Sequence, residues 1–166
     1  MDFEKYWLLI TTKMLNLYKN DSKRIQHFLK VYTITKLICQ MEEVDEKTLW
    51  ICCCSALVHD IGIKEATKKH GYCNGYLQQL YGPNEAMKLL EDCNLDRESI
   101  ERICFLVGHH HTYNDIKQLD YQILVEADFL VNFYEEGLKP YNRDYCVNKI
   151  FKTKSGLKLY DLMYRP

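Results

Sequence analysis

Apolar side chains recur every three to four residues along most of this 166-residue chain, and no segment alternates apolar and polar residues as a strand would. The stretch that begins at His27 is an example, because Val31, Ile34 and Ile38 follow it at helical spacing. This period is typical of amphipathic helices packed against a common core. The sequence therefore predicts an all-α fold.

Capping residues and helix breakers divide the pattern into segments. The Asn-Asp-Ser sequence at 20–22 separates the first two helices, and Gly62 ends the third. Pro83 is expected to open a helix, because proline is favoured in a first turn. The Gly- and Tyr-rich segment 63–82 is expected to be an irregular loop that could include one short turn of helix. We expect a single domain over 1–166, with helices at about 3–18, 23–41, 45–60, 83–93, 96–109, 121–135 and 140–151 and a short one from 154 onward.

Composition excludes several classes of function. Hydrophobic residues make up 47% of the chain, enough for a core without disulfides or structural zinc. The 22 basic and 23 acidic residues give a formal net charge of -1, so the basic excess needed to bind a nucleic-acid polymer is absent. The apolar run from Trp7 to Ile10 is too short for a signal peptide or a membrane span. We therefore expect a cytoplasmic protein that binds no membrane.

The eight cysteines do not form a recognisable framework. Cys52, Cys53 and Cys54 are consecutive in a helical pattern, and no Cys-x-x-Cys pair occurs. Adjacent residues of a helix point in different directions, so they neither clamp zinc nor form a simple bridge. We expect reduced cysteines that pack as small hydrophobic side chains.

Four ionisable residues have apolar neighbours and face the predicted core. His27 lies on the inward face of its helix, His59 and Asp60 end the apolar segment 49–58, and Asp128 has apolar neighbours one turn away on either side. A buried carboxylate is costly unless a cation or several donors meet it. Alone, His27 is more often a core histidine, and Asp128 could accept hydrogen bonds from another helix. Together, two imidazoles and two carboxylates favour a divalent metal ion: Mn, Fe, Co, Ni, Zn or Mg.

The order His27 … His59-Asp60-Ile61-Gly62 … Asp128 resembles the HD superfamily of metal-dependent phosphohydrolases. The Arg-Ile-Gln-His sequence at 24–27 resembles the first-helix motif of that family. The Ile-Leu-Val-Glu-Ala-Asp sequence at 123–128 resembles the helix that carries its last ligand. The resemblance covers about residues 20–135, and the C-terminal helices at 140–166 follow this motif core.

The resemblance implies an HD-domain bundle of about six to eight helices in which His27, His59, Asp60 and Asp128 bind a divalent metal ion. It also implies hydrolysis of a phosphate ester by a metal-activated water, with Asp60 as a catalytic residue that orients this water. Glu126 points to another face of the same helix and is expected to be structural.

The histidines at 109–111 have two interpretations. Binuclear members of the family, such as the HD-GYP type, add histidines in this region, so His109 or His110 could bind a second metal ion or a substrate phosphate. Alternatively, histidines at a helix C-terminus simply interact with the helix dipole. Binuclear members also carry a histidine where this chain has Tyr81, and that difference favours one metal ion. His70 is a further candidate ligand from the expected loop.

Charged and aromatic residues after the His-Asp pair are candidates for substrate binding. Lys64 and Lys68 are expected to bind a phosphate or leaving-group oxygen, with Lys64 also catalytic. The alternative is a solvated basic surface. Glu65 is a candidate general base. Tyr81 belongs to a loop whose rings could stack on a base.

The leading functional hypothesis is a metal-dependent phosphohydrolase acting on a small phosphorylated molecule such as a nucleotide. Two alternatives remain open. One is an HD-type di-iron oxygenase, and the other is a non-catalytic sensor or interaction module that keeps the metal. Exposed tyrosines and the apolar first helix make a homodimer plausible.

Overall fold

The computed structural model describes residues 3–93 and 95–165, and every regular element within these ranges is helical. The all-α prediction is therefore confirmed. None of the described helices combines the length and the apolar character needed to cross a membrane. The elements are α1 (Phe3–Leu17), α2 (Ser22–Met41), α3 (Glu46–Val58), α4 (Ile63–His70), α5 (Gly75–Leu90), the 3₁₀ turn η1 (Glu91–Cys93), α6 (Arg97–Val107), α7 (Leu119–Glu135), α8 (Pro140–Ile150) and α9 (Lys154–Tyr164).

Helix α3 lies at the centre of the core. Asp45 caps its first turn by accepting a hydrogen bond from the backbone N–H of Thr48, and every residue from Trp50 to Val58 is buried. A helix that is apolar all round must be covered on every side. Accordingly, α1, α2, α6 and α7 all pack against α3. The polar His59 and Asp60 follow directly where this apolar helix ends.

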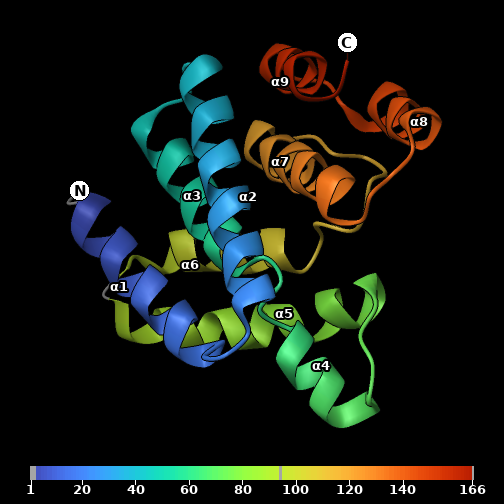
Figure 1. Ribbon diagram of the computed structural model, residues 1–166. Coiled ribbons are helices and arrows are strands. Elements are labelled where there is room, and N and C mark those ends of the chain that lie inside the picture. The colour runs from blue at the N-terminus through green and yellow to red at the C-terminus, as the bar shows by residue number, and fades with distance from the viewer. Residues whose placement is uncertain (1–2, 94, 166) are drawn as a thin grey trace.

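The other helices are arranged around the α2–α3 pair (Figure 1). Helices α7, α8 and α9 lie on one side of this pair, and α4, α5 and α6 lie near its lower end in that view. Helix α2 packs against both α3 and α7, whereas α5 packs against α4 and α6. The N-terminal half of α2, the end of α3 and the middle of α7 can therefore contribute side chains to one site.

The prediction of an irregular loop over 63–82 is wrong. The structure has α4 there, followed by the first half of α5, which continues through Pro83 instead of beginning at it. The glycines meet a packing requirement: a Cβ on Gly62 would lie 2.7 Å from a backbone carbonyl oxygen of α5, and a Cβ on Gly82 would lie 2.6 Å from a side chain of α6. Residues without a side chain allow these segments to approach closely, so they do not mark a break in the helix.

The cysteines agree with the prediction from their spacing. No disulfide occurs among the residues that the structure describes, and all eight cysteines are free. The consecutive Cys52, Cys53 and Cys54 are all buried in α3. Burial raises the pKa of the Cys53 thiol to about 12 and that of Cys104 to about 11, so these side chains stay protonated at neutral pH.

Glu126 attaches the C-terminal helices to α7. Its carboxylate accepts hydrogen bonds from the backbone N–H groups of Lys152 (2.6 Å) and Thr153 (2.9 Å) and from the Thr153 hydroxyl. A fourth hydrogen bond comes from the side-chain amide of Gln122 at 2.7 Å. A Cβ on Gly156, in the first turn of α9, would collide with the same carboxylate. The structural role expected for Glu126 is therefore confirmed.

Glu126→Ala should lower the free energy of unfolding by roughly 3 kcal/mol, because it leaves two N–H groups near α9 without an acceptor. Glu126→Gln keeps one acceptor oxygen and should cost about 1 kcal/mol. Urea denaturation followed by circular dichroism measures both changes. The matched control is Glu98→Ala, because Glu98 is an exposed helical acid that should change stability by less than about 0.5 kcal/mol. Equal stabilities of Glu126→Ala and this control would contradict the assigned role.

Candidate metal centre

Three helices bring the four predicted ligands to one point. Asp21 caps the first turn of α2, so His27 lies one turn further along on the inward face. His59 is the C-terminal cap of α3, and Asp60 lies in the turn that follows. Asp128 lies in the middle of α7. All four ligand candidates are at most 5% exposed to solvent.

The ligand atoms of these residues face one another. The two Nε2 atoms of His27 and His59 are 3.1 Å apart, and Asp128 Oδ1 lies 3.2 Å from the first and 3.5 Å from the second. Asp60 is slightly further away, with its two oxygens 3.7 Å and 3.8 Å from the Nε2 atoms of His27 and His59. Two ligands bound to one ion at about 2.1 Å lie about 3 Å apart. The spacing therefore fits one shared divalent ion.

The outer nitrogens of both rings are already used. Nδ1 of His59 donates to the backbone carbonyl oxygen of Ala56 at 2.9 Å, and Nδ1 of His27 donates to a carboxylate oxygen of Glu135 at 2.9 Å. A carbonyl oxygen and an ionised carboxylate can only accept, so each Nδ1 must carry a proton. The neutral rings then present two Nε2 lone pairs to each other. That arrangement requires either an additional proton or a cation between the two rings.

The carboxylates add to this requirement. Burial alone would raise the pKa of Asp128, but the pKa is held well below its usual range when His27 and His59 carry a further proton on Nε2 and donate it to this carboxylate. Burial likewise opposes ionisation of Asp60, and the neighbouring histidines hold its pKa below the usual range. Two buried, ionised carboxylates beside imidazole lone pairs form a donor set suited to a divalent ion.

Arg24 and Asn132 support the carboxylates. Nη1 of Arg24 donates to Asp60 Oδ2 at 2.9 Å, and the side-chain amide of Asn132 donates to Asp128 Oδ1 at 2.9 Å. Both lie on the same helix faces as predicted ligands: Arg24 precedes His27 by three residues, and Asn132 follows Asp128 by four. Helical spacing relative to the predicted ligands therefore contains a signal for both residues.

A family model described as HD domain matches residues 24–149, which is most of the chain. The chain belongs to the HD-domain family. Among solved structures, this HD domain resembles a predicted HD superfamily hydrolase from an uncultured Thermotogales bacterium, with a TM-score of 0.67 and 20% sequence identity. The match covers 93% of this chain and 83% of the other one, and at this identity it concerns the fold. No curated protein matches the sequence.

The histidines at 109–111 of the HD domain have three different environments. His110 is buried, its Nδ1 donates to the carbonyl oxygen of Val107 at 2.9 Å, and its Nε2 lies 3.3 Å from Asp60 Oδ1. Within the described part of the chain, this Nε2 has no hydrogen-bonding partner. His109 instead stacks on Phe105 and donates to the carbonyl oxygen of that residue. Of the two residues predicted here, the structure brings only His110 to the cluster.

His111 also lies at the cluster, although it is not among the predicted site residues. Asp60, His110 and His111 bring ligand atoms within 4.8 Å of one another, as do His27, His59 and Asp60. However, His111 Nε2 is in contact with the amide oxygen of Gln78, so it carries the proton. The hydroxyl of Tyr113 then donates to Nδ1 at 3.1 Å. Both ring nitrogens of His111 are occupied. This favours a single ion, bound at the group that contains His27, His59 and Asp60.

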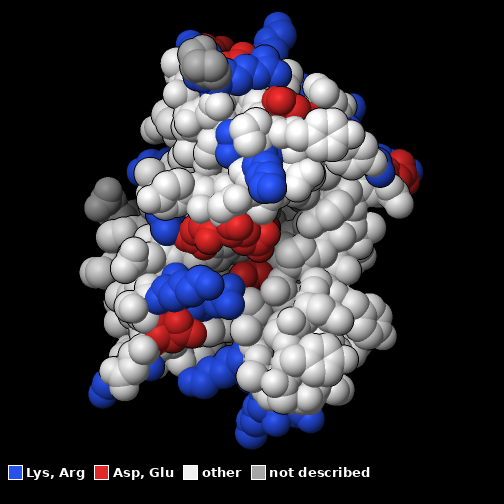
Figure 2. Space-filling view, turned by 45° about the vertical axis from the view of Figure 1, so that its right-hand side comes forward, with Lys and Arg blue, Asp and Glu red and all other residues white. Residues whose placement is uncertain are grey.

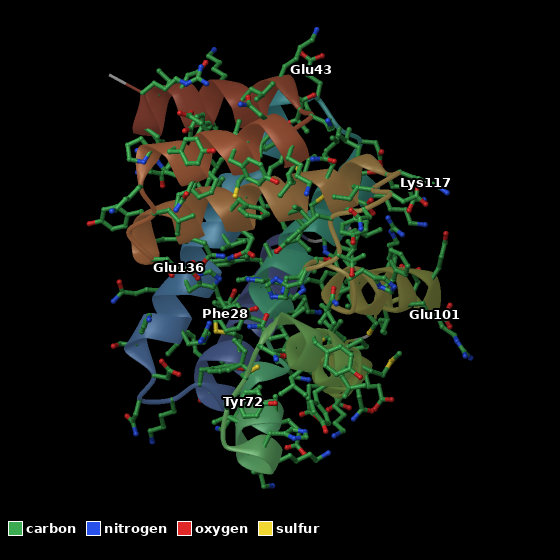
Figure 3. The ribbon with its side chains drawn as sticks, turned by 90° about the vertical axis from the view of Figure 1, so that its right-hand side faces the viewer. Phe28, Glu43, Tyr72, Glu101, Lys117 and Glu136 are labelled. Atoms are coloured by element: carbon green, nitrogen blue, oxygen red, sulfur yellow. The ribbon has the colours of Figure 1, made fainter. Side chains whose placement is uncertain are left out.

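A polar cavity of about 210 Å³ opens onto the ligands. Figure 2 shows acidic and basic side chains bordering a hollow on this face. In Figure 3, Glu136 lies above this region, after α7, and Tyr72 lies below it on the connection between α4 and α5. The cavity is lined by Lys23, Arg24, His27, Asp60, Gln78, His111, Asp128, Asn132, Glu135 and Glu136.

The structure does not bring the other predicted site residues to this cavity. The Lys64 ammonium donates to the carbonyl oxygen of Leu17 at 2.7 Å, and Lys64 and Lys68 line a separate hollow beside the end of α1. Glu65 pairs with Lys69 on the surface of α4. Tyr81 is hydrogen-bonded to His70 at 2.9 Å, also outside the cavity. Helix α4 turns away from the ligands, which the expected loop did not anticipate.

Asp60→Ala should lower metal affinity by more than roughly 100-fold, beyond the effect typical of losing a residue that only supports a ligand. Elemental analysis of protein prepared without a metal-affinity tag, followed by titration with Mn or Co, measures this loss. The helical circular dichroism spectrum should remain, because α3 ends before Asp60. Asp161→Ala, which removes an exposed carboxylate of α9, is the control and should bind metal as wild type does. Full metal content in Asp60→Ala would contradict the site.

Proposed function

We propose that this HD domain is a divalent-metal-dependent hydrolase of phosphate monoesters that acts on a small phosphorylated molecule such as a nucleotide. The observation that carries the proposal is the group of inward-facing imidazole and carboxylate ligands at the base of a small polar cavity. A guanidinium group lies beside them. Membership in the HD-domain family and the fold shared with a predicted HD superfamily hydrolase agree with it.

The ion would be bound by His27, His59, Asp60 and Asp128. The imidazole lone pairs and carboxylate charges of these residues suit a divalent cation. An ion bound there supplies Lewis acidity toward a phosphoryl oxygen and lowers the pKa of water. Asp60 and Asp128 both line the cavity, and each accepts a hydrogen bond, Asp60 from Arg24 and Asp128 from Asn132. Asp60 would orient an attacking water and accept its proton, which is the role that the resemblance to the HD superfamily implies for it.

Arg24 is the group that would bind the phosphate. Its Nη1 contacts Asp60, and its Nε is buried without a partner among the described residues. The Arg24 side chain lines the polar cavity. A guanidinium there is suited to an anionic oxygen, and arginine binds phosphate with two parallel hydrogen bonds. Lys23 lines the same cavity and adds positive charge.

The size of the cavity limits the substrate. A volume of about 210 Å³ is below the roughly 300–1,000 Å³ typical of pockets that enclose a drug-sized ligand. A phosphate with its ester oxygen fits inside, and the rest of the molecule would lie at the opening. This arrangement supports hydrolysis at the end of a small molecule.

The experiment that tests the proposal combines metal analysis with a substrate panel. Tag-free protein loaded with Mn or Co is incubated with nucleoside monophosphates and sugar phosphates, and released phosphate is measured. We expect metal-dependent release that is absent in Asp60→Ala. About one bound metal ion per chain without turnover across the panel would favour the sensor, and two irons per chain would favour the oxygenase.

Arg24→Gln should lower kcat/KM for the best phosphate ester by about 100-fold, because one missing charged hydrogen-bond donor costs about 2.7 kcal/mol or more in the transition state. Steady-state phosphate release and a parallel metal titration measure the two effects separately. Lys19→Gln removes an exposed cation outside the cavity and should leave kcat/KM within about twofold, because exposed charges act weakly through water. Similar losses in both variants would indicate a general electrostatic effect and not a phosphate contact.

A further inference from the structure

The three buried histidines of the centre differ in what holds their outer nitrogen. His59 and His110 donate Nδ1–H to neutral backbone carbonyl oxygens of their own helices, at 2.9 Å in both cases. His27 donates instead to Oε2 of Glu135, a side-chain carboxylate from another helix, also at 2.9 Å. A ring that donates to a carboxylate carries more negative charge on its far nitrogen than one that donates to a carbonyl. His27 is therefore distinct among these ligand candidates.

Glu135 is held in place for this contact. It lies in the last turn of α7, seven residues after Asp128 and so on the same helix face. Its side chain is only 13% exposed, and its second oxygen forms an ion pair with the ammonium of Lys30. Lys30 follows His27 by three residues on α2. The carboxylate thus contacts two residues of one helix face, one through each oxygen.

We propose that Glu135 is a positioning residue: its carboxylate holds His27 in the tautomer that directs the Nε2 lone pair to the metal ion and strengthens that bond. This inference rests on the metal site of the proposed function. The competing explanation is structural, with the Lys30–Glu135 ion pair joining α2 to α7 and no effect on the ligand.

The two explanations differ in what Lys30 does. In Glu135→Gln the amide has one oxygen, and the Lys30 ammonium attracts it. The amide NH₂ then faces His27 Nδ1 and favours the tautomer with the proton on Nε2, which blocks the ligand. Lys30→Gln leaves the carboxylate in place, and the double variant frees the amide oxygen to accept from Nδ1 again. A structural ion pair would instead be lost equally in all three variants.

The test measures Co²⁺ affinity by calorimetry and the visible absorption of the Co²⁺-loaded protein. We expect Glu135→Gln to weaken binding about 10–100-fold and to change the absorption spectrum, as is typical when a residue supporting a ligand is lost. Lys30→Gln should stay within about threefold of wild type, because the ammonium is partly exposed and its charge is screened. The double variant should bind more tightly than Glu135→Gln alone.

The matched control is Glu136→Gln, which removes the adjacent carboxylate of the same cavity wall (Figure 3) and should not change Co²⁺ affinity. Equal losses in Glu135→Gln and Lys30→Gln, or no loss in Glu135→Gln, would overturn the inference. Melting temperatures of the metal-free variants separate affinity from folding. If the wild-type protein binds Co²⁺ but hydrolyses no phosphate ester, only the proposed function is contradicted. If it binds no metal, the proposed function and the role of Glu135 are both contradicted.

Discussion

The rest of the structure depends on one constraint. Positive charge is needed at the point where His27, His59, Asp60 and Asp128 meet. Two ionised carboxylates and two imidazole lone pairs meet where each of the four residues is at most 5% exposed to solvent. Such a group is unstable unless protons or a metal ion supply positive charge. Because the outer nitrogens of both rings are fixed by acceptors, rotation of a ring cannot relieve the repulsion. The scaffold therefore stabilises an arrangement whose low-energy state contains a cation.

Helix α7 shows that burial of an acid does not by itself indicate a metal site. It carries two buried carboxylates two residues apart, Glu126 and Asp128, on different faces. Glu126 accepts hydrogen bonds from backbone and side-chain donors, and burial raises its pKa. Asp128 meets histidines that hold its pKa low. What separates a structural acid from a ligand is thus the chemistry of its neighbours, not its depth.

The meeting of these four residues could be predicted from the sequence because an apolar helix marks the direction in which its polar members point. His27 and Asp128 were identified in this way, and both are buried at the site. The helices in segment 63–82 could not be predicted in this way. The need for glycine arises from the contact between Gly62 and a part of α5 that is distant from it in sequence. That error also misplaced Lys64 and Glu65, since a loop could return to the ligands and a helix that turns away does not. Gln78 and His111 meet only in three dimensions.

The contact between Gln78 and His111 also bears on how many ions the centre holds. Asp60 and His110 could serve a second ion, and His111 lies close enough to complete its ligand set. The proton of His111 Nε2 is directed at the amide oxygen of Gln78, and its Nδ1 accepts from Tyr113. Burial lowers the pKa of His111 to about 4, so the ring is neutral at pH 7 and this proton is its only one. A second ion would require that proton to move and the Gln78 amide to turn. An ion bound by His27, His59, Asp60 and Asp128 requires no such rearrangement. The contact between Gln78 and His111 thus favours one metal ion at the centre.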